Sequence, residues 1–476
     1  MQLPTHPILR AVAWLSAAIA VAGCSSSDSR AEAALSDYQS AAAANNMLAA
    51  RKALLQLVRA KDDVADYWAE LGKLQASMGS YGDAYYAFTR AYELDRSNPE
   101  LLRALTELAL RSGDVGRAQT HARELSVVAP GDPWVKLVEG WAAISESQYA
   151  KALAVSDELL AVSPFNSAAV MLKGRALIGL NREDDAIDLL GKQLQSQPSD
   201  IGSLQLLSRI HEGRGDWPKL VDVAQRLTDL TAGDFQYGLI LVRASLRSGN
   251  IERARRASFK LLKPDASPQL VSSVLDLWAL YWPSSQRIAD ARMLANAASG
   301  QEQRLVYAAF LSRVGSAADA LRLAGNAATL PINAQNAEAN AVFADALSRT
   351  GNLGGAKARF DAVLAFDPGN ATALRGRSEL ELRTGNARAA VEDAQKLTTV
   401  LPNSSSDRLL LSRAFAASGD GAWAERTLWT AFQDIPADER IYAALRATKS
   451  GNVDAMNDLQ AEFARQRGAK VRQGLL

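Results

Sequence analysis

The sequence predicts an all-α chain built from stacked helical hairpins. Three observations lead to this prediction. Turn-forming residues recur every 34 positions, prolines recur at the same interval in a second phase, and the apolar residues between these marks fall at helical spacing. A fixed period of this length indicates one repeated unit, so most of the 476 residues are expected to form an array of neighbouring units.

Glycine, or a residue that tolerates the same backbone conformation, marks the turn between the two helices of each unit. The first unit, 31–64, carries Asn45 at this place. The later marks are Gly79, Gly113, Ser147, Asn181, Gly215, Gly249, Gly351, Gly385 and Gly419. The prolines of the second phase are Pro130, Pro164, Pro198, Pro368, Pro402 and Pro436. Because proline has no N–H, each is expected to stop the second helix of its unit or to start the next helix.

The unit 65–98 shows how one hairpin is encoded. Apolar residues at helical spacing give each of its two helices one apolar face, and Gly79 ends the first helix between them. Gly72 and Ala84 are small where the two helices are expected to cross, and Phe88 fills the space beyond them. The unit is therefore predicted to be a closely packed helical hairpin.

This unit resembles the tetratricopeptide repeat (TPR). The matching residues are Trp68, Leu71, Gly72, Gly79, Tyr81, Ala84, Phe88 and Ala91, whereas Gln75 replaces the usual aromatic residue and Arg96 the usual proline. The resemblance implies a TPR solenoid of about a dozen stacked hairpins that form a right-handed superhelix. It also implies a concave groove that is lined by the first helix of each hairpin.

The repeat phase slips in the middle of the chain and again near the end. After Gly249 the turns fall at Pro283, Gly315 and Gly351, at irregular steps, which indicates either a kink between two arrays or variation without a role. The predicted divisions are 1–23 signal peptide, 24–30 polar tether, 31–268 N-terminal TPR array, 269–336 degenerate helical repeats, 337–464 C-terminal TPR array and cap, and 465–476 frayed tail.

The single cysteine follows a short apolar run at the N-terminus. This run has about a dozen residues, fewer than the ~20 that a membrane-spanning helix needs, and is typical of a signal peptide. Val21, Ala22 and Gly23 before Cys24 resemble the lipobox of bacterial lipoproteins. The resemblance implies that Cys24 is acylated, with palmitate among the chains, and anchors the protein in a membrane. The alternative is an ordinary secretory signal with an incidental cysteine.

Composition argues against several classes of function. The formal net charge of +1 gives no field that would attract nucleic acid. The three histidines lie far apart and in no metal-ligand spacing, and no catalytic motif is recognisable. We therefore expect no enzyme activity, no metal and no cofactor.

Candidate binding residues follow from the groove that the TPR resemblance implies. Lys73, Trp141, Arg175, Arg209 and Arg243 occupy the ninth position of their units, and Leu137, Met171 and Leu239 lie four places earlier in three of these helices. Arg175, Arg209 and Arg243 are in consecutive units and would form a ladder of guanidinium groups that suits carboxylates or phosphates. The alternative is that these arginines are solvated and pair with neighbours such as Glu212. A row of arginines before the turns, which includes Arg111, Arg247 and Arg349, is expected to be structural because cations are favoured at helix C-termini.

Together these features predict a non-enzymatic, lipid-anchored TPR scaffold that binds protein partners in its concave groove. The location expected is the periplasmic face of a bacterial outer membrane, because Ser25 follows Cys24 where Asp would resemble an inner-membrane retention signal. Lipoproteins of this design resemble accessory factors of exopolysaccharide export and of pilus or secretin assembly. The alternative function is direct binding of an anionic glycan by the arginine-lined groove.

Overall fold

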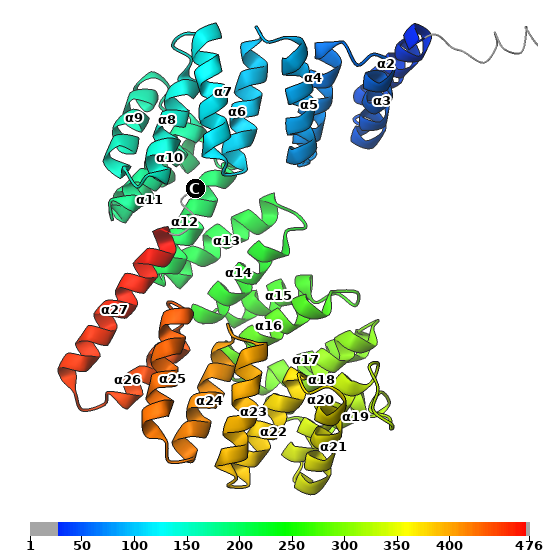
Figure 1. Ribbon diagram of the computed structural model, residues 1–476, viewed down its shortest axis with the longest axis vertical. Helices are drawn as coiled ribbons and strands as arrows, with labels where there is room; N and C mark the ends of the chain where they lie inside the picture. Colours follow the sequence, from blue (N-terminus) through cyan, green and yellow to red (C-terminus); the bar gives the residue numbers. More distant parts are fainter. Residues whose placement is uncertain (1–26, 473–476) are drawn as a thin grey trace, which may run out of the picture. The chain divides into compact units, whose positions relative to one another are not determined.

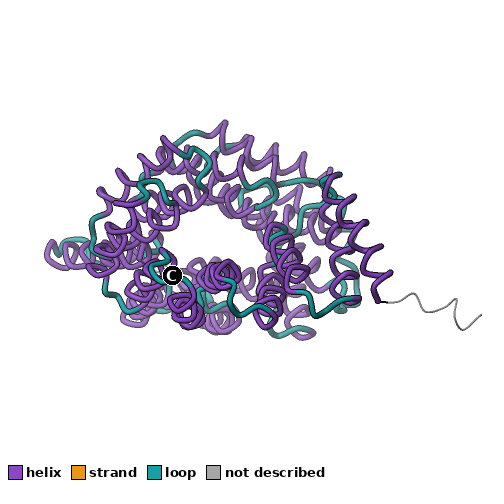
Figure 2. The backbone as a smooth tube through the Cα atoms, turned by 90° about the horizontal axis from the view of Figure 1, so that it is seen from above, coloured by secondary structure: helices purple, strands orange, loops and turns teal. Residues whose placement is uncertain are grey.

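The computed structural model describes residues 27–472, and every regular element in this range is an α-helix. Figure 2 shows the same range as helices joined by loops. The first half contains α2 (Ser27–Ala43), α3 (Met47–Ala60), α4 (Ala65–Ser77), α5 (Tyr81–Leu94), α6 (Pro99–Arg111), α7 (Val115–Val128), α8 (Pro133–Ser145), α9 (Tyr149–Val162), α10 (Ser167–Gly179), α11 (Glu183–Ser196), α12 (Ile201–Arg214), α13 (Trp217–Leu230) and α14 (Phe235–Arg247). The rest contains α15 (Ile251–Leu261), α16 (Pro268–Tyr281), α17 (Ser285–Ala297), α18 (Gln301–Arg313), α19 (Ala317–Gly325), α20 (Ala337–Arg349), α21 (Leu353–Phe366), α22 (Ala371–Arg383), α23 (Ala387–Val400), α24 (Ser405–Ala417), α25 (Gly421–Asp434), α26 (Glu439–Thr448) and α27 (Val453–Arg472).

Most consecutive helices of the described range pair as hairpins, and the pairing follows the 34-residue period where the repeat is regular (Figure 1). In the hairpin of α4 and α5, Ala84 is fully buried and a Cβ on Gly72 would lie 3.0 Å from the ring of Phe88. The small residues therefore allow the close crossing that the sequence predicted. The fold class is confirmed as all-α, a solenoid of stacked helical hairpins.

The turns confirm the role assigned to the periodic small residues. All of the glycines at the marked positions have positive φ, between 73° at Gly215 and 95° at Gly351. Asn45, Ser147 and Asn181 adopt the same left-handed conformation, with φ of 53°, 58° and 59°. This conformation lets the chain reverse after the first helix, and glycine adopts it without a steric penalty.

The prolines of the second phase act at the ends of the second helices. α7, α9 and α11 end at Val128, Val162 and Ser196, two residues before their prolines, and α21, α23 and α25 end in the same way. Proline disfavours helical backbone in the residue before it and has no N–H to continue the hydrogen-bond ladder. Of the two predicted roles, these prolines therefore stop the second helix.

The chain divides into two compact units, and the break falls between Arg182 and Glu183. Unit 1 holds α2 to α10 and unit 2 holds α11 to α27. The break lies directly after the turn at Asn181, and α11, which follows it, packs against α12. This division differs from the expected boundaries at residues 268 and 336, which were placed where the repeat phase slips.

The stretch expected to be degenerate, 269–336, is irregular but densely packed. α19 has only nine residues, and no helix follows it until α20 begins at Ala337. Trp278 is fully buried, its ring centroid lies 4.9 Å from that of Trp282, and its indole N–H donates to Ser258 Oγ at 2.9 Å. Here aromatic packing replaces the regular repeat contacts.

The predicted ends of the array differ from the structure in two places. Cys24 and the lipobox residues lie outside the described residues, but α2 begins at Ser27, within the expected tether. α27 continues to Arg472, through most of the segment expected to be a frayed tail. The helix extends this far because Val471 is buried and Arg467 donates to a backbone carbonyl of α12.

Candidate binding surfaces

The candidate groove residues of unit 1 lie on three helices, α4, α8 and α10. Lys73 is exposed on α4 and pairs with Glu70, with 2.7 Å between Nζ and Oε1. Leu137 on α8 is buried, and Met171 on α10 is half-buried. Trp141 and Arg175 do meet, because the Arg175 guanidinium lies 4.7 Å from the Trp141 ring centroid. This cation–π contact joins the first helices of two successive hairpins, as the 34-residue period predicts.

The candidate residues of unit 2 lie closer together. Arg209 on α12 and Arg243 on α14 line the same cavity, and Leu239 packs against the core of this unit. Arg243 also forms an ion pair with Glu212, with 2.8 Å between Nη2 and Oε1. Of the three arginines expected to form a ladder, Arg175 belongs to unit 1, and Arg209 and Arg243 belong to unit 2.

Arginines of the row before the turns engage protein groups in the structure. Arg111 pairs with Glu107 at 2.9 Å, and Arg349 pairs with Asp345 at 3.0 Å. Arg247 differs from these, because it lines the cavity of unit 2 and pairs with Glu439, 192 residues later in the sequence. Its guanidinium also lies 4.4 Å from the ring centroid of Trp217. The sequence assigned Arg247 a local role, and the structure gives it a long-range one.

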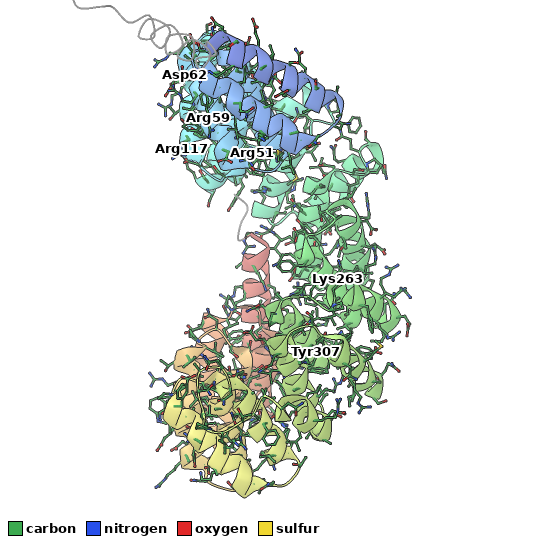
Figure 3. All side chains as sticks on the ribbon, turned by 90° about the vertical axis from the view of Figure 1, so that its right-hand side faces the viewer. Arg51, Arg59, Asp62, Arg117, Lys263 and Tyr307 are labelled. Carbon is green, nitrogen blue, oxygen red and sulfur yellow. The ribbon has the colours of Figure 1, made fainter. Side chains whose placement is uncertain are left out.

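A hollow of about 270 Å³ lies among α3, α4 and α5 in unit 1. Its floor is apolar, and the rings of Trp68 and Tyr86 meet edge to face there with centroids 6.0 Å apart. Gln75, at the position where the TPR pattern has an aromatic residue, is 4% exposed, and its Oε1 has no hydrogen-bond partner. Arg51 and Arg59 of α3 also line this hollow, and Figure 3 labels both residues. Arg51 pairs with Asp83 at 3.3 Å, and Arg59 forms no ion pair with the residues that the structure describes.

Sequence reasoning missed this hollow for a physical reason. The period located Gln75 and identified it as a departure from the pattern, which was the available signal. The spacing of residues along a helix does not show how neighbouring side chains fill the space around a replaced one. The periodicity also could not predict the ion pair between Arg51 and Asp83, because it joins two different hairpins.

The two described histidines sit in structural positions. His121 Nε2 lies 2.8 Å from the Tyr85 hydroxyl oxygen, and His211 Nδ1 lies 3.5 Å from Asp216 Oδ2. Burial lowers the pKa of both imidazoles. Within residues 27–472, no three His, Cys, Asp or Glu side chains form a group that could hold a metal ion. None of the described helices combines the length and the apolar character needed to cross a bilayer.

Comparisons with known proteins identify the repeat. Models of the tetratricopeptide repeat match residues 143–210 and residues 342–406, one segment in each half of the chain. A search of curated proteins gave no match.

Several solved structures resemble parts of the chain. PilW, described as a widely conserved type IV pilus biogenesis factor, is 17% identical with a TM-score of 0.34, over 41% of this chain and 91% of that one. PilF of Pseudomonas aeruginosa is 14% identical with a TM-score of 0.32, over 42% and 91%. The MamA protein is 16% identical with a TM-score of 0.30, over 36% and 92%. With TM-scores this low, these likenesses carry no argument about function.

Proposed function

We propose that this TPR protein is a non-enzymatic, lipid-anchored scaffold that binds protein partners in the bacterial cell envelope. TPR arrays generally bind protein partners, and the repeat models match this chain in both halves. The observation that supports partner binding most directly is the hollow among α3, α4 and α5. Apolar side chains, the Gln75 amide and the Arg59 guanidinium, which forms no ion pair with the described residues, all line this one hollow.

The chemistry of this hollow defines the segment that would fit it. An apolar side chain would cover Leu71 and the Trp68 ring, which border the hollow. Gln75 also lines the hollow and gives its wall a polar group, because its buried Oε1 has no hydrogen-bond partner. A carboxylate beside that side chain would meet Arg59. The fitting partner is therefore a peptide segment with an apolar residue next to an acidic group.

Site-specific crosslinking in the native cells tests partner binding. A photoreactive residue replaces Tyr86, which is 60% exposed at the hollow, and a matched control replaces Val162, which is 86% exposed on α9. We expect a discrete protein adduct from position 86 that is absent from position 162 and weakened by Arg59→Gln. Equal adducts from both positions, or an adduct that Arg59→Gln leaves unchanged, would refute this assignment.

The membrane anchor of the proposal depends on Cys24, which the lipobox resemblance marks for acylation. Acyl chains would hold the protein stably at a membrane surface, since stable anchoring takes more than one chain. We expect Cys24→Ser to move the protein from the membrane fraction to the soluble fraction and to abolish labelling with palmitate. Ser26→Ala serves as the control, and membrane fractionation of the Cys24→Ser variant would contradict the anchor.

We place the scaffold at the periplasmic face of the outer membrane, in a machine for exopolysaccharide export or for pilus or secretin assembly. The support is the residue after Cys24 and the combination of a lipobox with a long TPR array. Mass spectrometry of the adduct from position 86 identifies the machine. Recovery of export, pilus or secretin components supports this assignment, and recovery of cytoplasmic proteins alone counts against it.

Direct binding of an anionic glycan is the second candidate function. It is favoured by the positive side chains around Arg209 and Arg243 in unit 2. Retention on an immobilised anionic polysaccharide should then decrease with salt, and Arg209→Ala combined with Arg243→Ala should abolish it. Retention that salt leaves unchanged would exclude this candidate.

A further inference from the structure

The C-terminal helix completes a cavity in unit 2. α27 lies against α12, and the cavity of about 470 Å³ between them is also lined by α14 and by the start of α26. Figure 1 shows α27 running from α26 back to α12. A volume of this size lies within the usual range for small-ligand sites, about 300–1,000 Å³.

The contact between α27 and α12 is close and specific. Arg467 Nε donates to the carbonyl oxygen of Gly213 at 2.8 Å, and Val471 is 2% exposed. A Cβ added to Gly213 would lie 1.9 Å from Val471 Cγ2. The absence of a side chain at Gly213 is therefore what allows α27 to approach α12.

Positive charge dominates the lining of this cavity. Six cations line it, namely Arg209, Arg243, Arg247, Arg440, Arg467 and Lys470, against the three carboxylates of Glu212, Asp438 and Glu439. All three carboxylates already bind arginine: Glu212 binds Arg243, Glu439 binds Arg247 and Asp438 binds Arg440. The lining thus holds more cations than carboxylates.

Two of these cations have donors that no protein group uses. Arg243 Nε is buried and has no hydrogen-bond partner, although Nη2 of the same side chain binds Glu212. Lys470 has no carboxylate partner among the described residues. Cations that share a partly enclosed space repel one another, and an anion bound among them relieves this repulsion.

We propose that this cavity binds a compact polyanion, a small molecule with two or three phosphate or carboxylate groups. This inference goes beyond the proposed scaffold function, because the ligand is neither a protein nor a polymer. A compact ligand fits because α27 lines the cavity together with α12 and α14, the helices that carry Arg209 and Arg243. Two of the six cations, Arg467 and Lys470, come from α27 itself. Ligand binding therefore holds α27 in place and stabilises unit 2.

Calorimetric titration of the purified full chain tests the proposal with two probes. Tripolyphosphate carries phosphate groups and citrate carries carboxylates. The probe that binds with the higher affinity therefore identifies the preferred anionic group. We expect 1:1 binding that weakens as salt is raised. Arg243→Gln and Lys470→Gln should each weaken binding at least tenfold, and Lys260→Gln, which removes an exposed cation of α15 outside the cavity, should leave it unchanged.

Gly213→Ala tests the role of α27 separately. The added methyl group displaces Val471, so this variant should lose probe binding and the protection that the probe gives against thermal unfolding. Gly191→Ala, on α11 with no atom within 4 Å of the added Cβ, is the matched control. Circular dichroism checks that both variants keep their helix content.

Two outcomes would overturn the proposal, namely absence of binding by both probes and equal weakening by Lys470→Gln and Lys260→Gln. If neither compact probe binds and polygalacturonate does, the result favours the glycan groove. None of these results affects the partner crosslinking at position 86, so the failure of this proposal and that of the scaffold function are distinguishable.

Discussion

Gly376 and Phe360 provide a quantitative test of the packing between hairpins. Gly376 lies within α22, and a Cβ at this position would be 2.4 Å from Cζ of Phe360 on α21. Phe360 is fully buried, and ordinary van der Waals contact begins near 3.4 Å. Gly376→Ala therefore requires a shift of the ring or of α22.

The matched variant Gly191→Ala isolates this steric effect. Both glycines lie inside helices, so both substitutions gain helix propensity worth about 1 kcal/mol. Gly191 has no neighbour within 4 Å of the added Cβ, so its substitution should stabilise the protein. Overpacking costs about 1–3 kcal/mol, so the free energy of unfolding of Gly376→Ala should be lower than that of Gly191→Ala by this amount.

Urea denaturation followed by circular dichroism measures this difference. The unfolding midpoints of the two variants can be compared when the free energy of unfolding falls with urea concentration at the same slope in both. Phe360→Leu provides the internal check, because a shorter side chain should remove most of the penalty of Gly376→Ala in the double variant. Equal midpoints for the two alanine variants, or a penalty that persists with Leu at position 360, would refute the predicted contact.

Three other side chains give predictions that thermal or urea unfolding can check. Trp278→Ala should lower the free energy of unfolding by about 3–5 kcal/mol, because it removes a fully buried ring, and a loss under 1 kcal/mol would contradict this packing. Asp407→Ala should lower the free energy of unfolding by about 3 kcal/mol, because it leaves the Arg375 side chain without its carboxylate partner. This figure is the lower end for a broken buried ion pair, since the Arg375 side chain is 33% exposed and water can partly solvate it. An unchanged unfolding midpoint would argue against the pair. Burial lowers the pKa of His121 from its usual value of about 6.5, so near and below that pH the unfolded state binds more protons than the folded state, and the free energy of unfolding should fall as acid is added. His121→Asn should reduce this fall between pH 7 and pH 5. An identical pH profile for the variant and the natural protein would exclude the effect.

The sequence was sufficient for the repeat because each hairpin is specified locally. Gly79 and Asn181 mark turns through a backbone conformation that few residues adopt, and Phe88 beside Gly72 encodes a close helix crossing. These signals lie within one unit of 34 residues, so periodicity alone reveals them. The pairing of Trp141 with Arg175, one period apart, follows from the same regularity.

The candidate sites were harder to predict because they depend on contacts that the period does not encode. One of the two sequence-based interpretations was that the arginines pair with neighbours such as Glu212, and Arg243 does so. The cavity that these two residues line is completed by α27, which the sequence did not predict. Lys470 belongs to a segment whose polar sequence predicted fraying, and its neighbour Val471 gave too short a signal to oppose that reading. The break of the array after Arg182 likewise leaves no mark in the repeat phase.

The hydrogen bond between Arg467 and Gly213 joins residues 254 positions apart. Contacts between neighbouring helices close only short loops of chain, so in a repeat array they can form early and in any order. The contact of α27 with α12 closes a loop that contains all the intervening helices, so we expect it to form late in the assembly of unit 2. Protection of the Val471 amide from hydrogen exchange should then appear after that of the neighbouring-helix contacts.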